Sequence, residues 1–344
     1  MIGDHMPWQS IDAWLLLVIA AGGIVLLVFG ADRAVTAAAR VAAALGMSEV
    51  IIGATVVSLG TTMPEACTSV TAAFRGEPGL AMGNAVGSII CDTGLVFGLG
   101  CLMTRLPLDR FILYRQGMLW VLGGTLLTVT LLLLALVRGS FRGVVMFRWI
   151  GVLYLFLLGG YLCVSVRWAR RHPAMVPPEA RAAAAGVPRP RHAPMDFAVM
   201  AVGLAMVVVG SDLLVGSAKE LSVRCGVPPD VLAVTMVAFG TSLPELVTAI
   251  TAVRKGHGEI MIGNVIGADI LNVLFVVGAS ATAVPLAVDL NFFYLYLPAM
   301  MLVLGLMAAY IFTSGKSFRR WQGLPLLLMY AAFIALAVRL GALR

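Results

Sequence analysis

Ten apolar segments follow one another along the chain, and each is long enough to cross a lipid bilayer as an α-helix. Of the 344 residues, 60% are hydrophobic and only 12% are charged, against about 25% charged in a typical soluble domain. Because lipid offers no hydrogen-bond partners, a spanning segment must satisfy its backbone internally, as a helix does. We therefore expect an all-α polytopic membrane protein. The segments lie near 13–31, 47–73, 80–102, 116–137, 146–167, 196–215, 227–253, 259–281, 291–313 and 322–341.

One polar stretch divides these segments into two sets of five. Residues 168–195 are rich in Pro, Ala and Arg and lack hydrophobic periodicity, which predicts a flexible linker. The chain would then consist of one five-helix membrane region over 1–167 and another over 196–344. The five arginines of the linker place it in the cytoplasm, and five helices per half place both termini outside. Three arginines between 138 and 148 do not fit this orientation.

The charge balance also bears on partners and location. The chain has a net charge of +7, which in a soluble protein would suggest nucleic-acid binding. Here the arginines lie between apolar segments, where they set topology and contact anionic lipid. The five cysteines form no CxxC pair, and the four histidines lie near segment ends, so neither disulfides nor a zinc site are expected. We expect a multi-pass protein of the inner (plasma) membrane that binds lipid but no nucleic acid and requires no oligomer.

The two halves are related by an internal repeat with a constant offset, which pairs Glu65 with Glu245. Residues 55–98 match 235–278 without a gap, with 16 identities in 44 positions. The identities gather at Gly, Pro, Thr, Asn and Glu, whereas chance similarity between apolar helices would place them at Leu, Val and Ala. Because each half has an odd number of helices, the second enters the membrane upside down. The chain is therefore predicted to form two inverted five-helix repeats, an arrangement typical of secondary transporters with a binding site at the bilayer midplane.

Each repeat carries its glutamate in the middle of an apolar segment. Glu65 and Glu245 are preceded by Pro64 and Pro244, in the matching sequences GTTMPE and GTSLPE. A carboxylate at this depth costs about 2.5–3.5 kcal/mol or more and marks a functional site by default. A proline within a helix forces a bend and frees the carbonyl four residues earlier. Broken helices at the midplane are therefore expected, with exposed carbonyls that line a cavity or meet a cation.

Hydroxyl side chains accompany both glutamates. Thr61 and Thr62, like Thr241 and Ser242, precede them by four and three residues and so share their helix face. Carboxylates, hydroxyls and freed carbonyls form an all-oxygen site, which selects hard cations. Two carboxylates match the charge of one Ca²⁺, and Mg²⁺ is less favoured because it loses water reluctantly.

A second polar line follows in each repeat. Asn84, Ser88 and Asp92 are spaced by four residues and share a helix face, and their repeat partners are Asn264, Ala268 and Asn272. The glycines of GNAVG and GNVIG allow close helix packing at small-xxx-small spacing.

These paired motifs resemble the two alpha-repeats of the calcium/cation antiporter superfamily, and in particular its prokaryotic sodium/calcium exchangers. The motifs cover about 90 residues, and the two-by-five layout extends the resemblance over the whole chain. The resemblance implies an antiporter, not an enzyme, that exchanges Ca²⁺ for Na⁺ by alternating access and keeps cytosolic calcium low. It implies no cofactor, since both ions are transported. Matched position by position, it implies ion ligation by backbone carbonyls of Ser58 and Ala238 and by hydroxyls or carbonyls of the residues that precede the glutamates. The full set is Glu65, Glu245, Thr61, Thr62, Thr241, Ser242, Ser58, Ala238, Ser88, Asp92 and Asn272.

The chain departs from the family pattern after each GNxx segment, where the family usually reads Gly-Ser-Asn. Here Ile89 follows Ser88 in the first repeat, and the second repeat reads Gly267-Ala268-Asp269. Ala268 lacks a hydroxyl expected at one Na⁺ site, and Asp269 adds a carboxylate beside it. These changes leave the calcium site intact and the counter-ion open.

Four alternatives remain at this point. Paired glutamates that carry protons would make a Ca²⁺/H⁺ exchanger, and K⁺ could be a linked ion. A cation channel would show flux without a counter-ion. An intramembrane enzyme could use Glu65 and Glu245 as acid and base, although no nucleophile or metal-binding histidine accompanies them. Asp92 and Asn272 could also serve only as hydrogen-bonding links between helices.

Overall fold

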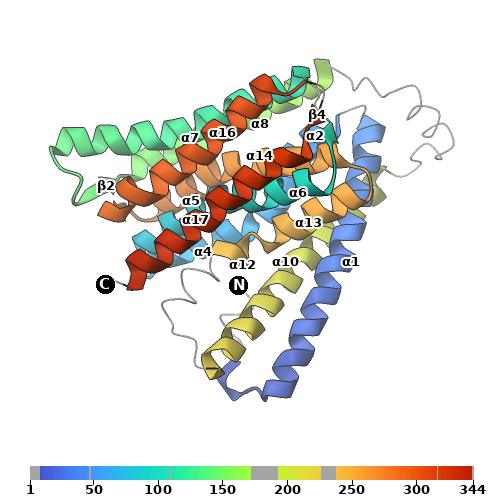
Figure 1. Cartoon of the computed structure of the whole chain (residues 1–344), viewed down its shortest axis with the longest axis horizontal. Helices are drawn as coiled ribbons and strands as arrows, with labels where there is room; N and C mark the ends of the chain where they lie inside the picture. Colours follow the sequence, from blue (N-terminus) through green and yellow to red (C-terminus); the bar gives the residue numbers. More distant parts are fainter. Residues whose placement is uncertain are drawn as a thin grey trace.

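In the part of the chain that the structure describes, the regular elements are helices and four short strands, as the apolar segments predict (Figure 1). Within the described residues, eight helices are long and apolar enough to span a membrane. A ninth span results if the bent pair Glu49–Thr61 and Met63–Phe74 is counted as one. The predicted segment 227–253 is not among them, because residues 226–237 lie outside the described part. This computed structural model describes residues 8–45, 48–107, 110–171, 193–225, 238–315 and 317–342.

The first half contains long helices interrupted by π-helical turns. Its elements, in chain order, are the 3-10 helix η2 (Trp8–Ser10), α1 (Ala13–Leu45), α2 (Glu49–Ile52), the π-helix η3 (Gly53–Val57), α3 (Ser58–Thr61), α4 (Met63–Phe74), α5 (Pro78–Cys91), the π-helix η4 (Asp92–Phe97), α6 (Gly98–Met103), β1 (Leu106–Pro107), α7 (Arg110–Arg138), β2 (Val144–Met146) and α8 (Arg148–Arg171).

The second half follows the same order. Its elements are α10 (Ala193–Arg224), α12 (Ala238–Thr241), α13 (Leu243–Arg254), α14 (Gly258–Leu271), the π-helix η6 (Asn272–Val277), α15 (Gly278–Ala283), β3 (Leu286–Val288), the π-helix η7 (Phe292–Tyr296), α16 (Leu297–Thr313), β4 (Ser317–Phe318), the 3-10 helix η8 (Arg320–Gln322) and α17 (Gly323–Ala342). The offset that relates the two sequences also carries the bounds of α4, α5, η4 and α6 onto those of α13, α14, η6 and α15. The sequence repeat is thus also a repeat of backbone structure.

The expected linker falls mostly outside the described residues. Helix α8 continues to Arg171 and α10 begins at Ala193, so the helices extend a few residues into 168–195 from both sides. Residues 172–192 are not described.

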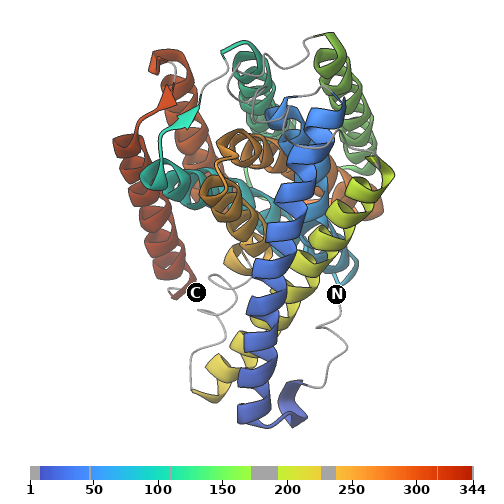
Figure 2. The same ribbon diagram turned by 90° about the vertical axis from the view of Figure 1, so that its right-hand side faces the viewer.

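Helices α1 and α10 lie side by side and project beyond the rest of the molecule (Figures 1 and 2). Glycines bring their backbones together at two points. A Cβ on Gly30 would lie 2.7 Å from the Gly203 carbonyl oxygen, and a Cβ on Gly23 would lie 2.8 Å from that of Gly210. Because Gly203 and Gly210 are the repeat partners of Gly23 and Gly30, the two contacts are equivalent, as a two-fold arrangement of the repeats requires.

Short strands join the halves in the same reciprocal way. Strand β1 pairs with β4, and β2 pairs with β3, both antiparallel. Since β3 is the repeat partner of β1, each half contributes one strand to each pair. The most buried helices are α5 and α14, which carry the second polar line and lie inside the bundle.

Candidate ion-binding site

The site is built on two helix breaks. Helix α3 ends at Thr61 and α4 begins at Met63. The axis of α4 lies at 43° to that of the preceding helical stretch Glu49–Thr61. Pro64 has no N–H to bond the Gly60 carbonyl, which accounts for the break at this point. Glu65 consequently lies in the first turn of α4, where helical N–H groups favour a negative charge. Glu245 occupies the same position at the start of α13.

The carbonyls at these breaks are only partly free. The Gly240 carbonyl accepts a hydrogen bond from Ser211 Oγ of α10 at 3.1 Å. The Ser58 carbonyl accepts from the Thr62 amide at 2.8 Å and from Thr61 Oγ1 at 3.3 Å. A proline break therefore does not by itself leave a carbonyl free to bind an ion, because a neighbouring hydroxyl can donate a hydrogen bond to that carbonyl.

Hydrogen bonds between the halves hold the breaks against the helices that follow them. Thr61 Oγ1 donates to Asn264 Oδ1 at 3.3 Å, and in the reciprocal contact Thr241 Oγ1 donates to Asn84 Oδ1 at 3.1 Å. Thr62 Oγ1 also donates to Glu245 Oε1 at 3.3 Å. Each repeat thus supplies hydroxyls to polar groups of the other, and the site exists only where the two repeats meet.

The carboxylates are fully buried and poor in donors. Glu65, Glu245 and Asp92 have no exposed surface, and Glu65 lies within electrostatic range of the other two. Neither oxygen of Glu65 or of Asp92 makes a hydrogen bond to a described residue, and nor does Glu245 Oε2. A buried carboxylate without donors is strongly unfavourable unless a cation or proton compensates its charge. These oxygens therefore have the chemistry expected of a cation site.

Two π-helical turns bring the second polar line to the glutamates. Asp92 begins η4, which packs against α13, and Asn272 begins η6, which packs against α4. Each turn thus meets the glutamate-bearing helix of the other half. Ser88 Oγ and both polar atoms of Asn272 are buried without a hydrogen-bond partner among the described residues. Interruptions of this kind are frequent at functional sites because they redirect side chains.

Comparison with known proteins identifies the family. The family model described as sodium/calcium exchanger protein matches residues 15–167 and 195–339. The chain belongs to this family. Its members are transporters and not enzymes, so the intramembrane acid–base alternative is set aside.

Similar proteins cover nearly the whole length of this exchanger-family chain. The sodium/calcium exchanger MaX1 of Methanosarcina acetivorans is 29% identical, over 91% of this chain and 95% of its own. The inner membrane protein YrbG of Escherichia coli is 34% identical, over 78% of this chain and 79% of its own. A solved structure of the sodium-calcium exchanger NCX_Mj, soaked with Na⁺ and Ca²⁺, has a TM-score of 0.76 at 28% identity and covers 93% of this chain and 98% of that one.

Most of the predicted ligands lie together in the buried region between the repeats. The side chain of Ala238 is not described, and the Ser58 carbonyl already accepts two hydrogen bonds. The remaining predicted residues are buried: Glu65, Glu245, Thr61, Thr62, Thr241, Ser242, Ser88, Asp92 and Asn272. The described residues contain no group of three or more His, Cys, Asp or Glu side chains placed to hold a metal. Hydroxyl, amide and carbonyl oxygens would therefore complete the coordination of any ion here.

Several polar residues at the site are absent from the predicted ligand set. Asn84 and Asn264 accept the reciprocal hydrogen bonds between the halves. Their position in the GNxxG motifs is the sequence feature that could have indicated a role at the site. Thr248 is fully buried with a hydroxyl that has no partner among the described residues. It lies three residues after Glu245, so helical spacing places it on the same helix face and could have predicted its place at the site. Trp120 donates to Asp269 at 2.7 Å from within an apolar segment, where no sequence signal marks it.

Proposed function

We propose that this protein is an antiporter that exchanges Ca²⁺ for Na⁺ across the membrane by alternating access. The observation that carries the proposal is the pair of buried glutamates on equivalent helix breaks, whose carboxylates are short of hydrogen-bond donors. The names of similar proteins, MaX1 and NCX_Mj, support sodium and calcium as the ions. Ca²⁺ and Na⁺ are then transported ions and not resident cofactors.

In this proposal the two ions compete for the same negative charges. Glu65 and Glu245 supply the charge that balances Ca²⁺, and nearby hydroxyls add neutral oxygens, as hard cations require. Asp92, Ser88 and Asn272 complete the subsites that several Na⁺ ions occupy when Ca²⁺ has left. Because the empty carboxylates are costly to bury, the site changes sides only when it is loaded. Mutual exclusion at one site couples the two fluxes.

The placement in the membrane is part of the same proposal. We assign the protein to the inner membrane, with exchanger regions at 1–167 and 196–344. The arginine-rich segment 168–195 would face the cytoplasm and both termini the outside. In this orientation an inward Na⁺ gradient drives the expulsion of calcium, and lipid is the only other partner required.

Radioactive Ca²⁺ uptake into Na⁺-loaded proteoliposomes tests the proposal. The wild type is compared with Glu65→Gln and Glu245→Gln, which remove the charge with little change in shape. Glu77→Gln makes the same chemical change at an exposed position and is the matched control. We expect uptake that requires the outward Na⁺ gradient, persists in the control and disappears in both site variants.

Other outcomes have definite meanings. Uptake driven by a pH gradient alone, or only with K⁺ present, would keep the site and change the counter-ion. Flux that is independent of any counter-ion would indicate a channel. No uptake under any gradient, from folded protein, would overturn the assignment of calcium.

A further inference from the structure

A further buried carboxylate, Asp269, lies outside the proposed ligand set. This residue of α14 is 2% exposed. Its Oδ2 accepts hydrogen bonds from Thr93 Oγ1 of η4 and from Trp120 Nε1 of α7, the latter at 2.7 Å. One carboxylate of the second half thereby anchors two elements of the first.

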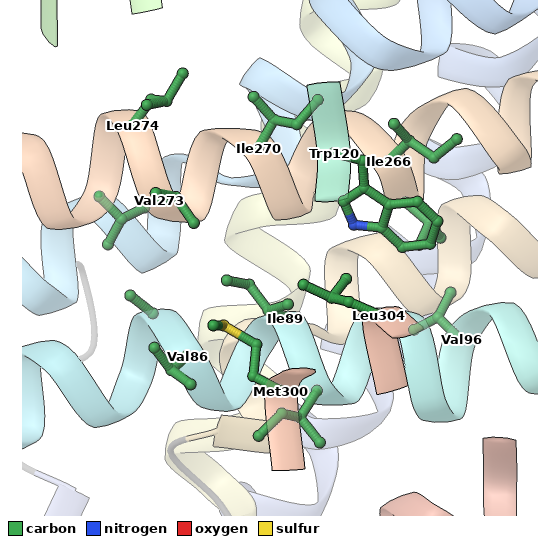
Figure 3. Close-up of a cluster of buried hydrophobic side chains, with 14 of the residues drawn as sticks. Val86, Ile89, Val96, Trp120, Ile266, Ile270, Val273, Leu274, Met300 and Leu304 are labelled. Atoms are coloured by element: carbon green, nitrogen blue, oxygen red, sulfur yellow. The ribbon is translucent and has the colours of Figure 1, made fainter. Parts of the chain in front are cut away.

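The equivalent positions of the repeat are entirely apolar. The constant offset pairs Asp269 with Ile89, Thr93 with Val273 and Trp120 with Met300. These three partners belong to one cluster of buried hydrophobic side chains, which also includes Trp120 (Figure 3). The turn η6 is therefore held at these positions by packing alone, whereas η4 is held in addition by the hydrogen bond from Thr93 to Asp269.

The anchored turn carries a proposed ion ligand. Thr93 directly follows Asp92, the first residue of η4. No described residue meets hydrogen-bonding geometry with either Asp92 oxygen, and the Ser242 hydroxyl of the other half acts on this carboxyl only outside that geometry. A hydrogen bond on the adjacent residue fixes the rotation of the π-helical turn and, with it, the direction in which Asp92 points.

We infer that Asp269 is a positioning residue for Asp92: through Thr93 and Trp120 it fixes η4 and so sets the affinity of the counter-ion subsite. The inference rests on the proposed function, in which the two glutamates hold Ca²⁺ and Asp92 serves Na⁺. It also explains the asymmetry between the repeats. The turn that presents the carboxyl group of Asp92 is anchored by a second carboxyl group, and the turn that presents the amide of Asn272 is not.

Calcium binding to the purified protein, followed by calorimetry, tests the inference without requiring transport. Na⁺ is titrated to find the concentration that displaces half of the bound Ca²⁺. Thr93→Val keeps the shape and removes the hydroxyl, and Thr93→Ser restores it. We expect the Na⁺ midpoint to rise about threefold to tenfold in Thr93→Val, the size of one lost buried hydrogen bond, and to stay within about twofold of wild type in Thr93→Ser. Calcium affinity without Na⁺ should change by less than about twofold in both.

Further variants separate positioning from general stability. Trp120→Phe removes the second donor and should shift the Na⁺ midpoint in the same direction. Ile89→Val alters packing at the repeat partner of Asp269 and should leave the midpoint unchanged, even where it lowers the melting temperature. The Thr93→Val shift should also vanish when Asp92 is already Asn.

The failures are distinguishable. A wild-type protein that binds no Ca²⁺, or whose Ca²⁺ is not displaced by Na⁺, overturns the proposed function and this inference together. Normal wild-type behaviour with equal midpoints for Thr93→Val and Thr93→Ser overturns the inference alone. A shift in Thr93→Val that persists beside Asp92→Asn also overturns it, because the effect would then not pass through Asp92.

Discussion

The two repeats have matching backbones but different polar side chains. Helices and π-turns around the site begin and end at equivalent positions, and the strands pair reciprocally. In the first repeat the carboxylate lies at the start of the π-turn, as Asp92, whereas in the second it lies three residues earlier, as Asp269. Duplication thus supplies the architecture of the site, and single substitutions within it determine what each side of the site does.

The largest expected effect tests the symmetric part of this comparison. Glu65→Gln and Glu245→Gln should each weaken Ca²⁺ binding by more than the roughly 10–100-fold lost on changing outer-shell partners of a metal. Calorimetry on both purified variants checks this. Because the glutamates occupy equivalent positions, the two losses should be similar, and a difference above about tenfold would contradict an equal sharing of the ion.

The crossing of α1 and α10 offers a second test of symmetry. Ala at Gly30, or at its repeat partner Gly210, would in each case place a Cβ 2.7 Å from the facing carbonyl oxygen. Each substitution should destabilise the protein by about 1–3 kcal/mol, the usual cost of overpacking. Thermal unfolding in detergent measures the loss. Gly22→Ala, on the exposed face of α1, is the control and should cost nothing, because Ala favours the helix.

Exchanging side chains between the repeats tests the asymmetric part. Asp92→Asn should raise the Na⁺ concentration that half-saturates exchange by about tenfold, because a ligand charge is lost. Adding Asn272→Asp restores the total charge on the opposite π-turn. Because η6 lacks the hydrogen bond that anchors η4, the double variant should stay more than about threefold weaker than wild type. Recovery to within about threefold would show that charge alone is the main requirement. A double variant as impaired as Asp92→Asn alone would show that the anchoring of η4 matters more than the charge.

The smallest effect concerns the Gly240 carbonyl. Ser211 satisfies it at 3.1 Å, and the repeat partner of Ser211 is Ala31. Ser211→Ala leaves the buried carbonyl without this donor and should cost about 1 kcal/mol of stability. The measurement is again thermal unfolding, with exchange assayed in parallel. A gain in cation affinity in this variant would indicate that the carbonyl is a latent ligand that Ser211 withholds.

The sequence predicted those structural features that depend on a strong local rule. Apolar runs, prolines and the constant repeat offset predicted the helices, the helix breaks before Pro64 and Pro244 and the matching elements of the two halves. The π-turns η4 and η6 were not predicted, because their residues continue an apolar helical run and no local rule distinguishes a π-turn there. The hydrogen-bond partners of Asp269 were not predicted for a similar reason, since a tryptophan within an apolar segment ordinarily serves only to pack the core. The sequence pattern could not predict which side chains of one repeat contact those of the other.

Those contacts have a consequence for how the protein is made. Each strand pairs with a strand of the other half, and Thr61 and Asn84 each make a hydrogen bond to the second repeat in addition to those within their own repeat. The first half, synthesised and inserted first, cannot form these strand pairs or cross-repeat hydrogen bonds alone. It must therefore remain incompletely packed in the membrane, or be shielded there, until the second half is inserted. Separately expressed halves should accordingly regain activity only when they are produced together, and biogenesis is a two-part assembly encoded in a single chain.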